Sequence, residues 1–479
     1  MIIKLLTNRI KEVFLGLIIF EALSFWLWYC PSWSNLLFLV IFLTTLIISY
    51  FSLEWGIYII LTELFIGSHG HAIDLYLGTY HLSLRIGLFV AVFVAMLYHL
   101  YQKRDLHLLA VVNKKWLSFF VIMLLIGIVQ GLLRNGLSNT FFDVNGYLFL
   151  LLLPAFYLVF NPNFLINIFR LLLISVNWLT IKTYLLLFAF SHDLSWLDLS
   201  ILYRWIRDQR FGEITHVSNN FYRIFMQSQL YGAVVIILIL VVIYFWSKNN
   251  IRIKDQWYLY CSLLMSVALV LASFSRSYWI GLLVTFLIIC FILLIKKYLN
   301  WKRLLITLGI FVLAILLSIV LLFTWTSSWY GGQLSSRALE MTESAVSSRQ
   351  AQLIPLKNAI LQRPNFGSGF GRAVTYQSTD PRIKNEQNPT GTYTTFAFEW
   401  GYLDIILKIG IFGLLAYLAT IYTIYVKKAN LSQNGAKIDP LKLGFAYSII
   451  LLCIVNVFSP YLNHPLGIGL LLINFYHES

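Results

Sequence analysis

Long apolar runs separated by short polar stretches fill most of the chain. A helix needs roughly 20 residues to cross a hydrocarbon core of about 30 Å, and many of these runs are that long. The pattern therefore predicts an all-α, polytopic membrane bundle of about 12–14 transmembrane helices. The expected spans are residues 13–30, 35–52, 55–67, 83–101, 116–133, 146–160, 164–190, 224–246, 257–274, 277–296, 304–325, 400–426, 441–459 and 464–475. The third and the last are short enough to be tilted or re-entrant.

Composition excludes a soluble fold. The chain is 59% hydrophobic and 11% charged, whereas a soluble domain carries about 25% charged residues. The net charge of +15 would indicate a nucleic-acid partner in a soluble protein. Here most basic residues lie in short loops, where they report membrane orientation. We therefore expect a lipid bilayer, and no nucleic acid, as a partner.

The basic residues gather in alternate loops, as the positive-inside rule requires of cytoplasmic loops. They are Lys4, Arg9, Lys11, Lys103, Arg104, Lys114, Lys115, Lys248, Arg252, Lys254, Lys296, Lys297, Lys302, Arg303, Lys427, Lys428 and Lys437. Both termini are then cytoplasmic, and the two long segments 191–223 and 326–398 face outward. We expect a transmembrane bundle of about 11 spans at 1–325, an outer loop domain at 326–398 and C-terminal transmembrane helices at 399–479.

One amphipathic helix is predicted inside the second outward segment. Ser347 and Gln350 have the spacing of a capping box at a helix start, and Pro364 should end the helix. One face of this helix carries an apolar stripe with an arginine at each end: Arg349, Leu353, Leu356, Ile360 and Arg363. A glycine-rich turn, "NFGSGFG", follows. It is not a phosphate-cradling P-loop, because no Gly-Lys-Ser/Thr follows it.

Charged residues inside or at the edge of the membrane are costly and need an explanation. Asp404 and Lys408 have i, i+4 spacing and should neutralise each other. Glu399 stands just before the same helix, where it could cap the helix N-terminus or carry out chemistry. Glu21, Glu63, Arg85 and Lys182 are expected to face the bundle interior and pair. Arg204, Arg207 and Arg210 repeat every three residues, so they form either a solvated helix face or a site for phosphate or glycan.

Three passages in order resemble the bacterial O-antigen ligase and O-antigen polymerase superfamily. "FSRSYWIGLLV" (274–284) is similar to the Ser-Arg-Ser/Gly step between two spans, and "SSRQAQLIPLKNAILQRPNFGSGFG" to an arginine-headed outer helix. "EWGYLDIILKIGIFGLL" is similar to the final loop-to-helix motif, typically His-Asn-x-Tyr-Leu and then Gly-x-x-Gly-Leu. The resemblance at the level of motifs covers residues 274–415. Glu399 stands where the ligases have their histidine, which is a departure from the family pattern.

The resemblance implies a GT-C-like, metal-independent glycosyltransferase of the bacterial inner membrane that needs no cofactor. It implies a polyprenyl-diphosphate-linked oligosaccharide as donor, such as an undecaprenyl-linked one, and a glycan or glycolipid acceptor. Arg276 and Arg349 match the arginines that bind the diphosphate, and Glu399 becomes the candidate base. Arginine suits this role because its planar guanidinium binds phosphate oxygens in a bidentate manner. Further candidates for substrate binding are Arg207, Arg210, Arg363, Arg85 and Tyr402.

Three functions remain open on the sequence. The first is polymerisation of lipid-linked repeat units into O-antigen, capsule or exopolysaccharide, with a chain-length regulator as a further partner. The second is a ligase that moves a glycan to lipid A–core or to protein. The third is a transporter or flippase for a lipid-linked sugar, which should show internal repeats and helices broken at mid-membrane. Glutamate in place of the ligase histidine favours the polymerase.

Overall fold

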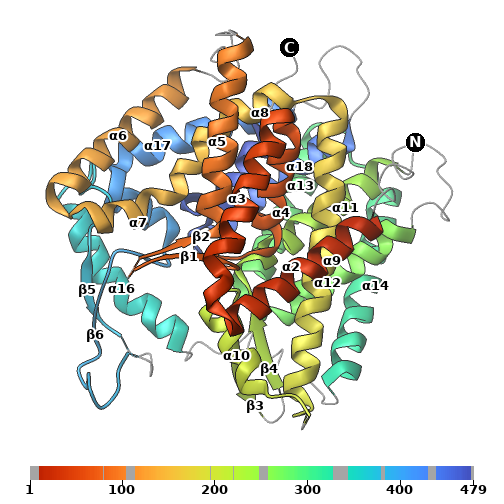
Figure 1. Ribbon diagram of the computed structural model, residues 1–479. Coiled ribbons are helices and arrows are strands. Elements are labelled where there is room, and N and C mark those ends of the chain that lie inside the picture. Colours follow the sequence, from red (N-terminus) through yellow and green to blue (C-terminus); the bar gives the residue numbers. More distant parts are fainter. Residues whose placement is uncertain are drawn as a thin grey trace. The chain divides into compact units, whose positions relative to one another are not determined.

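The structure is a computed structural model that describes residues 10–78, 80–103, 114–194, 196–218, 221–246, 257–326, 344–378, 383–429 and 439–475. In this part of the chain, helices dominate and the strands form three small antiparallel hairpins (Figure 1). The predicted all-α, polytopic membrane fold is confirmed. Several residues on which the orientation depends lie outside the described ranges: Lys4, Arg9, Arg104, Lys248, Arg252, Lys254 and Lys437.

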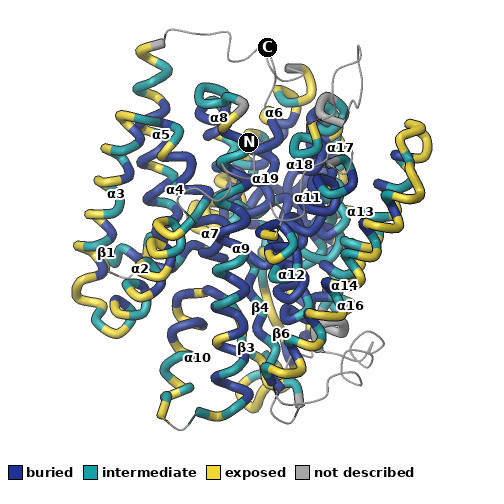
Figure 2. Tube along the Cα trace, turned by 90° about the vertical axis from the view of Figure 1, so that its right-hand side faces the viewer, coloured by how far each residue is buried: buried dark blue, intermediate teal, exposed yellow. Residues whose placement is uncertain are grey.

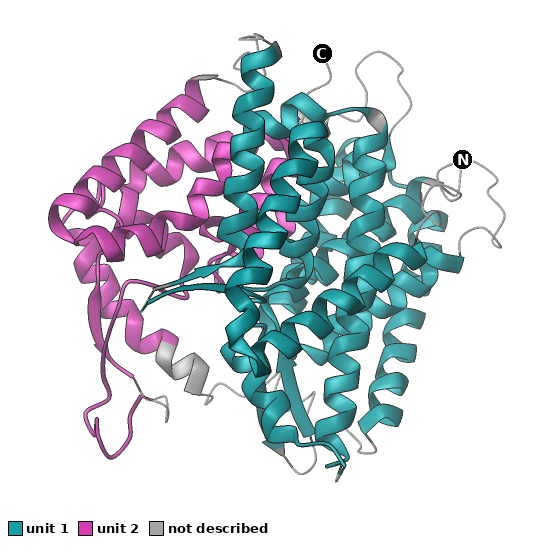
Figure 3. Cartoon of the chain, in the orientation of Figure 1, with its two compact units in different colours: residues 1–105, 152–330, 431–448 teal, residues 106–151, 331–430, 449–479 magenta. Residues whose placement is uncertain are grey.

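The chain divides by packing into two compact units, and each draws on several stretches of the sequence (Figure 3). Unit 1 comprises residues 1–105, 152–330 and 431–448, and unit 2 comprises 106–151, 331–430 and 449–479. Each unit therefore combines residues from the predicted bundle (1–325) with residues from the predicted loop domain (326–398) and C-terminal helices (399–479). Each unit is described below by itself.

Unit 1 holds most of the helices. They are α2 (Ile10–Tyr29), η1 (Pro31–Trp33), α3 (Ser34–Phe51), α4 (Leu53–Ile66), α5 (Leu84–Lys103), α8 (Leu153–Val159), α9 (Pro162–Ser191), α10 (Leu199–Asp208), η4 (Gln227–Gln229), α11 (Leu230–Trp246), α12 (Trp257–Ala272), α13 (Arg276–Ile295) and α14 (Trp301–Thr326). Two hairpins belong to it, β1 (Asp74–Leu77) with β2 (Tyr80–Ser83) and β3 (Glu213–Ser218) with β4 (Phe221–Phe225). Helix α18 (Pro440–Val455) has residues in both units.

Unit 2 is smaller and carries the last two of the three resemblance motifs. Its elements are α6 (Lys114–Arg134), α7 (Leu137–Leu148), η3 (Phe149–Leu152, with its last residue assigned to unit 1), α16 (Ser344–Leu361), α17 (Gly401–Ala429), η6 (Tyr461–Asn463) and α19 (Pro465–Asn474). The hairpin of β5 (Val374–Gln377) and β6 (Thr392–Thr395) pairs Val374 with Thr395 and Gln377 with Thr392.

Within the described residues, nine helices are long and apolar enough to cross a membrane, and three further apolar helices are shorter. The helices differ in how far they are buried. Helix α3 has exposed residues along its outer side, whereas α11 is almost wholly buried (Figure 2). In a membrane protein such apolar exposed faces are the ones that contact lipid. The chain is therefore a multi-pass membrane protein.

Two predicted spans begin elsewhere than expected. The span placed at 146–160 runs from Leu137 to Val159. Its first turns escaped prediction because they contain Asn139, Asp143 and Asn145, and Asp143 is in fact buried in a polar contact. The span placed at 224–246 begins as an α-helix only at Leu230, because strand β4 runs to Phe225 and the 3-10 helix η4 (Gln227–Gln229) follows it.

The four intramembrane charges of unit 1 form two buried ion pairs, as their position predicts. Lys182 Nζ lies 2.8 Å from Glu21 Oε2, and Arg85 Nε lies 2.8 Å from Glu63 Oε2. A second Arg85 nitrogen donates to the other Glu63 oxygen at 3.0 Å, so this pair is bidentate. The Lys182–Glu21 pair joins α9 to α2, which are distant in the sequence, and the Arg85–Glu63 pair joins the neighbouring helices α5 and α4.

Breaking one of these pairs should destabilise the protein strongly. Glu63→Ala leaves the Arg85 guanidinium buried without its counter-charge, which costs about 3–5 kcal/mol. The free energy of unfolding in mixed micelles measures it. The matched control is Asp208→Ala, which breaks the exposed Arg207–Asp208 pair and should change stability by less than about 1 kcal/mol. Equal effects of the two substitutions would contradict a buried Glu63–Arg85 pair.

Candidate functional site

An ion pair between Arg349 and Glu399 is the centre of the candidate site in unit 2. The Arg349 Nε–H donates a short hydrogen bond to Glu399 Oε2. The Glu399 side chain is 42% exposed and that of Arg349 is 30% exposed. Both charges are thus fixed in place yet accessible, as residues that meet a substrate must be. The structure brings together two of the three residues that the resemblance singles out.

A hydrophobic cluster packs the helix that carries Arg349 against the segment that carries Glu399. Leu356 and Ala359 of α16 pack with Val374 of β5, Phe398 and Leu407. Trp400 packs against this cluster, and its Nε1–H donates to the Arg349 carbonyl at 2.9 Å. The helix that carries Arg349 is therefore held to the segment that carries Glu399 by packing and by two hydrogen bonds.

Helix α16 itself differs from its prediction at both ends. It begins at Ser344, three residues before the expected start. The capping box at Ser347 is therefore wrong, and the helix also accommodates Pro355 in its interior. It ends at Leu361, so Arg363 lies beyond it and is exposed. The apolar stripe is confirmed by the buried Leu356.

The glycine-rich turn after α16 lies at a break in membrane helix α17 and forms hydrogen bonds with the helix backbone there. At Gly410 the helix has φ 73° and ψ 178°, so its regular hydrogen bonds are interrupted there. The turn supplies substitutes: Ser368 N donates to Leu407 O at 2.7 Å, and Gly369 N donates to Lys408 O at 3.1 Å. In return, Ile411 N donates to Pro364 O at 2.8 Å. Irregular backbone inside a membrane needs such protein partners because lipid offers none.

Glycine is required on both sides of this contact. Gly367, Gly369 and Gly371 all have positive φ. A Cβ on Gly369 would lie 2.5 Å from the Gly131 nitrogen of α6, and a Cβ on Gly410 would lie 2.1 Å from the Asn365 carbonyl oxygen. The spacing of glycines in the sequence thus reflects three backbones in close contact.

Gly410→Ala should destabilise unit 2 and lower activity together. The substitution meets both a positive φ, which costs about 1–3 kcal/mol for other residues, and the Asn365 carbonyl. The matched control is Gly309→Ala in α14, where an added Cβ meets nothing within 4 Å and the helix should gain up to about 1 kcal/mol. Thermal unfolding of both variants checks this, and the prediction fails if they are equally stable.

A buried charge cluster lies beside the break. Lys408 Nζ is 2.7 Å from Asp404 Oδ2, so the predicted i, i+4 pair is confirmed, but the ammonium also reaches Asp143 Oδ1 at 2.5 Å. Asp143 Oδ2 in turn accepts from Gly371 N at 2.6 Å, and the Asn463 amide donates to Asp404. One lysine therefore joins α7, α17 and the glycine-rich turn.

Asp143 and Asn463 were missed in the sequence. Asp143 lies on α7, ahead of the predicted start of its span, and Asn463 lies in the short 3-10 helix η6. The available signal was that a carboxylate and an amide bordered apolar runs, where polar groups need partners. Sequence spacing alone could not identify Lys408 as the partner of Asp143 or Asp404 as the partner of Asn463, because α7, α17 and η6 meet only in the fold.

Arg276 belongs to unit 1, where it is the first residue of α13 and half-buried. The residue before the helix N-cap, Phe274, has a φ of 50°, so the backbone turns sharply there. Arg223 of β4 donates from Nε to the Ser273 carbonyl at 2.9 Å and holds this turn. Arg276 lies within unit 1, whereas Arg349 and Glu399 lie within unit 2.

The other unit 1 arginines that the sequence proposes for substrate binding differ in their exposure and in their partners. Arg207 is exposed and pairs with Asp208 at 2.8 Å, whereas Arg210 is exposed with a φ of 49°. Arg85 is buried and bidentate on Glu63, so its guanidinium is already matched by a counter-charge.

Desolvation by the surrounding protein, and then repulsion by Arg85, lower the pKa of His69 to about 4. His69 is therefore neutral at pH 7.

Tyr402 and His71 have local partners. The Tyr402 hydroxyl donates to the Cys453 carbonyl at 2.7 Å, and His71 Nδ1 lies 3.0 Å from Asp74. Among the residues that the structure describes, no three His, Cys, Asp or Glu side chains are grouped as ligands for a metal ion. Arg363, at the end of α16, is exposed, and its carbonyl accepts from Gly367 N at 3.0 Å.

Residues 260–418 match a family model described as O-antigen ligase. This part of the chain is similar to the O-antigen ligase family. The match covers about a third of the chain and includes all three motifs, so the resemblance to the O-antigen ligase and polymerase superfamily is confirmed. No curated protein matches the chain by sequence. Arg276, Arg349 and Glu399 all lie within the matched residues.

Proposed function

We propose that the protein is a polymerase that joins polyprenyl-diphosphate-linked repeat units into a longer glycan on the outer face of the bacterial inner membrane. The observation that carries this proposal is the accessible Arg349–Glu399 pair inside the O-antigen ligase domain. A carboxylate beside an arginine combines a proton acceptor with a phosphate-binding group. The proposal needs no metal and no cofactor.

In the proposed reaction, the acceptor hydroxyl oxygen forms a bond to the anomeric carbon of the donor glycan. The bond from that carbon to the diphosphate oxygen breaks, and its electron pair leaves with the carrier diphosphate. The hydroxyl proton passes to Glu399, a general base of a kind that contributes roughly 10²–10⁴-fold. Arg349 and Arg276 stabilise the negative charge that develops on the diphosphate.

Arg349 can serve both groups at once. A guanidinium has five N–H donors in one plane, and the Nε–H is the one that it gives to Glu399. Its terminal nitrogens can then bind diphosphate oxygens. This arrangement would place the leaving group close to the base, which is the positioning that glycosyl transfer needs.

Glutamate at position 399 supports the polymerase over the ligase, since the ligases that the motif resembles have histidine there. The description of the matched family, O-antigen ligase, favours a ligase as the second candidate. A flippase receives some support from the broken helix α17. However, the partner of that break is the turn that follows the arginine-bearing helix, which ties it to the candidate site.

A deletion strain complemented with Arg276→Ala separates these functions. Losing one charge-stabilising group should lower transfer by roughly 100-fold or more, so the acceptor should carry single repeat units in place of a ladder. Arg303→Ala, at the other end of the α13–α14 hairpin, is the control and should restore full ladders. Polymer that accumulates on the carrier and never reaches the acceptor would instead identify a ligase. Carrier-linked units that build up inside the cell would identify a flippase.

A further inference from the structure

Helix α10 ends in a Schellman motif with an arginine at the position that usually holds glycine. Phe211 N donates to the Ile206 carbonyl at 3.0 Å, and Arg210 N donates to the Arg207 carbonyl at 3.1 Å. These are the two hydrogen bonds of that motif. Arg210 has a φ of 49° and is exposed. Glycine would adopt this left-handed conformation without strain, so the arginine lowers local stability.

Phe211, the residue after Arg210, is anchored on a buried ammonium group. Its side chain is 0% exposed, and Lys182 Nζ lies 3.5 Å from the centre of its ring. An ammonium has three N–H donors, and Lys182 donates hydrogen bonds to both Glu21 oxygens, at 2.9 and 2.8 Å. A cation over an aromatic face is attracted most strongly where water is excluded. The Lys182–Glu21 pair therefore fixes the residue that follows Arg210.

Trp205 completes this anchor from the helix itself. The centre of its ring lies 5.0 Å from Lys182 Nζ and 5.5 Å from the centre of the Phe211 ring. Its Nε1–H donates to Ser24 Oγ at 3.4 Å, and Ser24 in turn donates to the Ala72 carbonyl at 2.7 Å. The end of α10 is thus held against α2 and α9 by one lysine and two aromatic rings.

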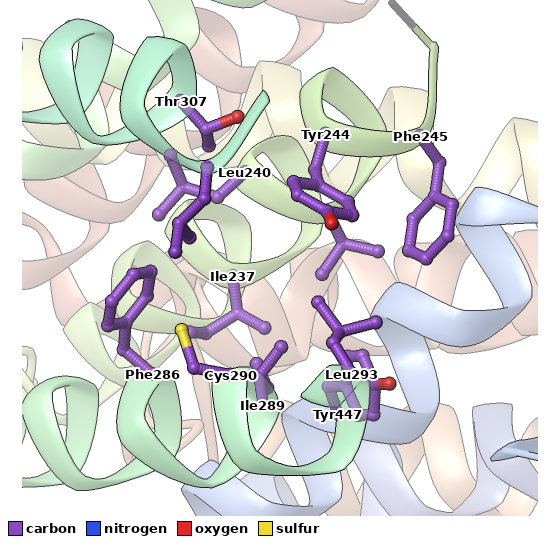
Figure 4. Close-up of a pocket in the computed structure, with 12 residues that line it drawn as sticks. Ile237, Leu240, Tyr244, Phe245, Phe286, Ile289, Cys290, Leu293, Thr307 and Tyr447 are labelled. Atoms are coloured by element: carbon purple, nitrogen blue, oxygen red, sulfur yellow. The ribbon is translucent and has the colours of Figure 1, made fainter. Parts of the chain in front are cut away.

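Helix α13 offers a comparison, because it ends in the same motif with Lys297 at the glycine position. Lys297 has a φ of 57°, and Tyr298 N donates to the Leu293 carbonyl at 2.9 Å. Tyr298, the counterpart of Phe211, is 36% exposed. Leu293 and Tyr244 line an apolar cavity of about 30 Å³ (Figure 4), and the Tyr244 hydroxyl donates to the Tyr298 carbonyl. Of these two motifs, the one in α10 is fixed by a buried cation.

The hairpin of β3 and β4 connects Arg210 to the turn before Arg276. Strand β3 begins shortly after Arg210, and its partner β4 carries Arg223. Arg223 Nε donates to the Ser273 carbonyl at 2.9 Å, and α13 begins at Arg276 shortly after this residue. The segment that starts at Arg210 therefore packs against the turn that positions Arg276.

We propose that Lys182 positions Arg210 for the diphosphate of the lipid-linked donor and that it acts through Phe211. The inference rests on the proposed function, and it gives a role to a buried ion pair that the proposed reaction does not use. Lys182 is a positioning residue, because its own charge is buried and matched by Glu21. The anchored Phe211 closes the motif and keeps Arg210 in its strained conformation, with an exposed guanidinium that suits phosphate oxygens.

Removing the ion pair as a whole tests this without leaving a buried charge. In Lys182→Leu/Glu21→Leu, two apolar side chains replace the pair, a change that often leaves stability little affected. The KM of the full-length protein in nanodiscs for an undecaprenyl-diphosphate-linked donor should rise about tenfold at nearly constant kcat, because Arg210 binds the diphosphate in ground state and transition state alike. A merely structural loss would instead lower the active fraction, and with it the apparent kcat, at an unchanged KM.

Phe211→Leu tests the same link with the ion pair left intact. It removes the aromatic ring that contacts the ammonium and keeps an apolar side chain, so the KM for the donor should rise here as well. An unchanged KM in Phe211→Leu, or in Lys182→Leu/Glu21→Leu, would overturn the proposal.

A double-mutant cycle shows whether Lys182 acts through Arg210. Arg210→Ala alone should raise the KM about tenfold, and adding Lys182→Leu/Glu21→Leu should raise it no further, because both changes remove one and the same interaction. A second rise of the same size would mean that the ion pair acts elsewhere, and the positioning role would be wrong.

Arg210→Gly separates function from stability at one position. Glycine relieves the left-handed strain, so Tm should rise by about 2 °C, while the KM for the donor should rise as it does in Arg210→Ala. Lys297→Gly is the matched control, because it relieves the same strain at the end of α13. It should raise Tm by a similar amount and keep the wild-type KM. If Arg210→Gly also keeps the wild-type KM, Arg210 does not bind the donor and the proposal fails.

Failure of this inference and failure of the proposed function give different results. If the wild-type protein transfers glycan and Lys182→Leu/Glu21→Leu keeps the KM, the positioning role fails and the polymerase proposal stands. If the wild-type protein transfers no glycan, the proposed function fails, and the dissociation constant of undecaprenyl diphosphate decides the inference. That constant should rise about tenfold in Lys182→Leu/Glu21→Leu, and an unchanged constant would overturn the positioning role.

Discussion

Glu399→Gln should abolish most glycosyl transfer while the protein stays folded and still binds the lipid-linked donor. Glutamine keeps the size of the side chain and an oxygen that can accept from Arg349, but it cannot take up the proton of the acceptor hydroxyl. Removing a general base lowers kcat by roughly 10²–10⁴-fold. The measurement is kcat and KM with purified protein in nanodiscs, and KM for the donor should change little.

Glu386→Gln is the matched control, because Glu386 is exposed in the loop between β5 and β6. It should keep wild-type kcat. If Glu399→Gln also keeps kcat within a few fold, Glu399 only holds Arg349 in place. Arg349→Lys separates these roles further, since lysine keeps the charge but loses the planar donor pattern that binds diphosphate.

Lys408→Met should cause the largest loss of stability in unit 2. It leaves the carboxylates of Asp404 and Asp143 buried without their shared cation, which costs about 3–5 kcal/mol. The effect should spread to the glycine-rich turn, because Asp143 also accepts from Gly371 N. The free energy of unfolding measures it, with the exposed Lys357→Met of α16 as control. Adding Asp143→Asn to Lys408→Met should restore part of the loss, since one unpaired charge is removed.

A change below about 1 kcal/mol in Lys408→Met would show that the carboxylates do not depend on the lysine. A loss equal to that of Lys357→Met would show the same. The double variant gives an independent check, because further destabilisation by Asp143→Asn would mean that Asp143 stabilises the fold without Lys408.

Sequence patterns predicted those features of the molecule that depend on local composition. Runs of apolar residues located the helices, and intramembrane charges predicted the buried pairs of Lys182 with Glu21 and Arg85 with Glu63. Errors arose where polar residues lay inside a span, as in α7, or where a strand led into a helix, as before α11. A local pattern cannot show that a polar group is matched by a partner far away in the chain.

In the candidate site, too, the sequence predicted the residues but not their contacts with distant parts of the chain. The order of the motifs indicated Arg349 and Glu399 as functional residues, but their direct ion pair depends on the packing of α16 against α17. The glycines after Pro364 signalled a tight turn. Only the three-dimensional structure shows that this turn lies at the break of α17. The last two of the three motifs that the family resemblance uses are therefore parts of one structural unit.

The most direct test of the account supplies purified protein in nanodiscs with a single undecaprenyl-diphosphate-linked repeat unit and no other acceptor. The account predicts carrier-linked chains of two and more units, release of free undecaprenyl diphosphate in equal number to the new bonds, and loss of both products in Glu399→Gln. Release of the carrier without any longer chain, or chain growth that persists in Glu399→Gln, would contradict it.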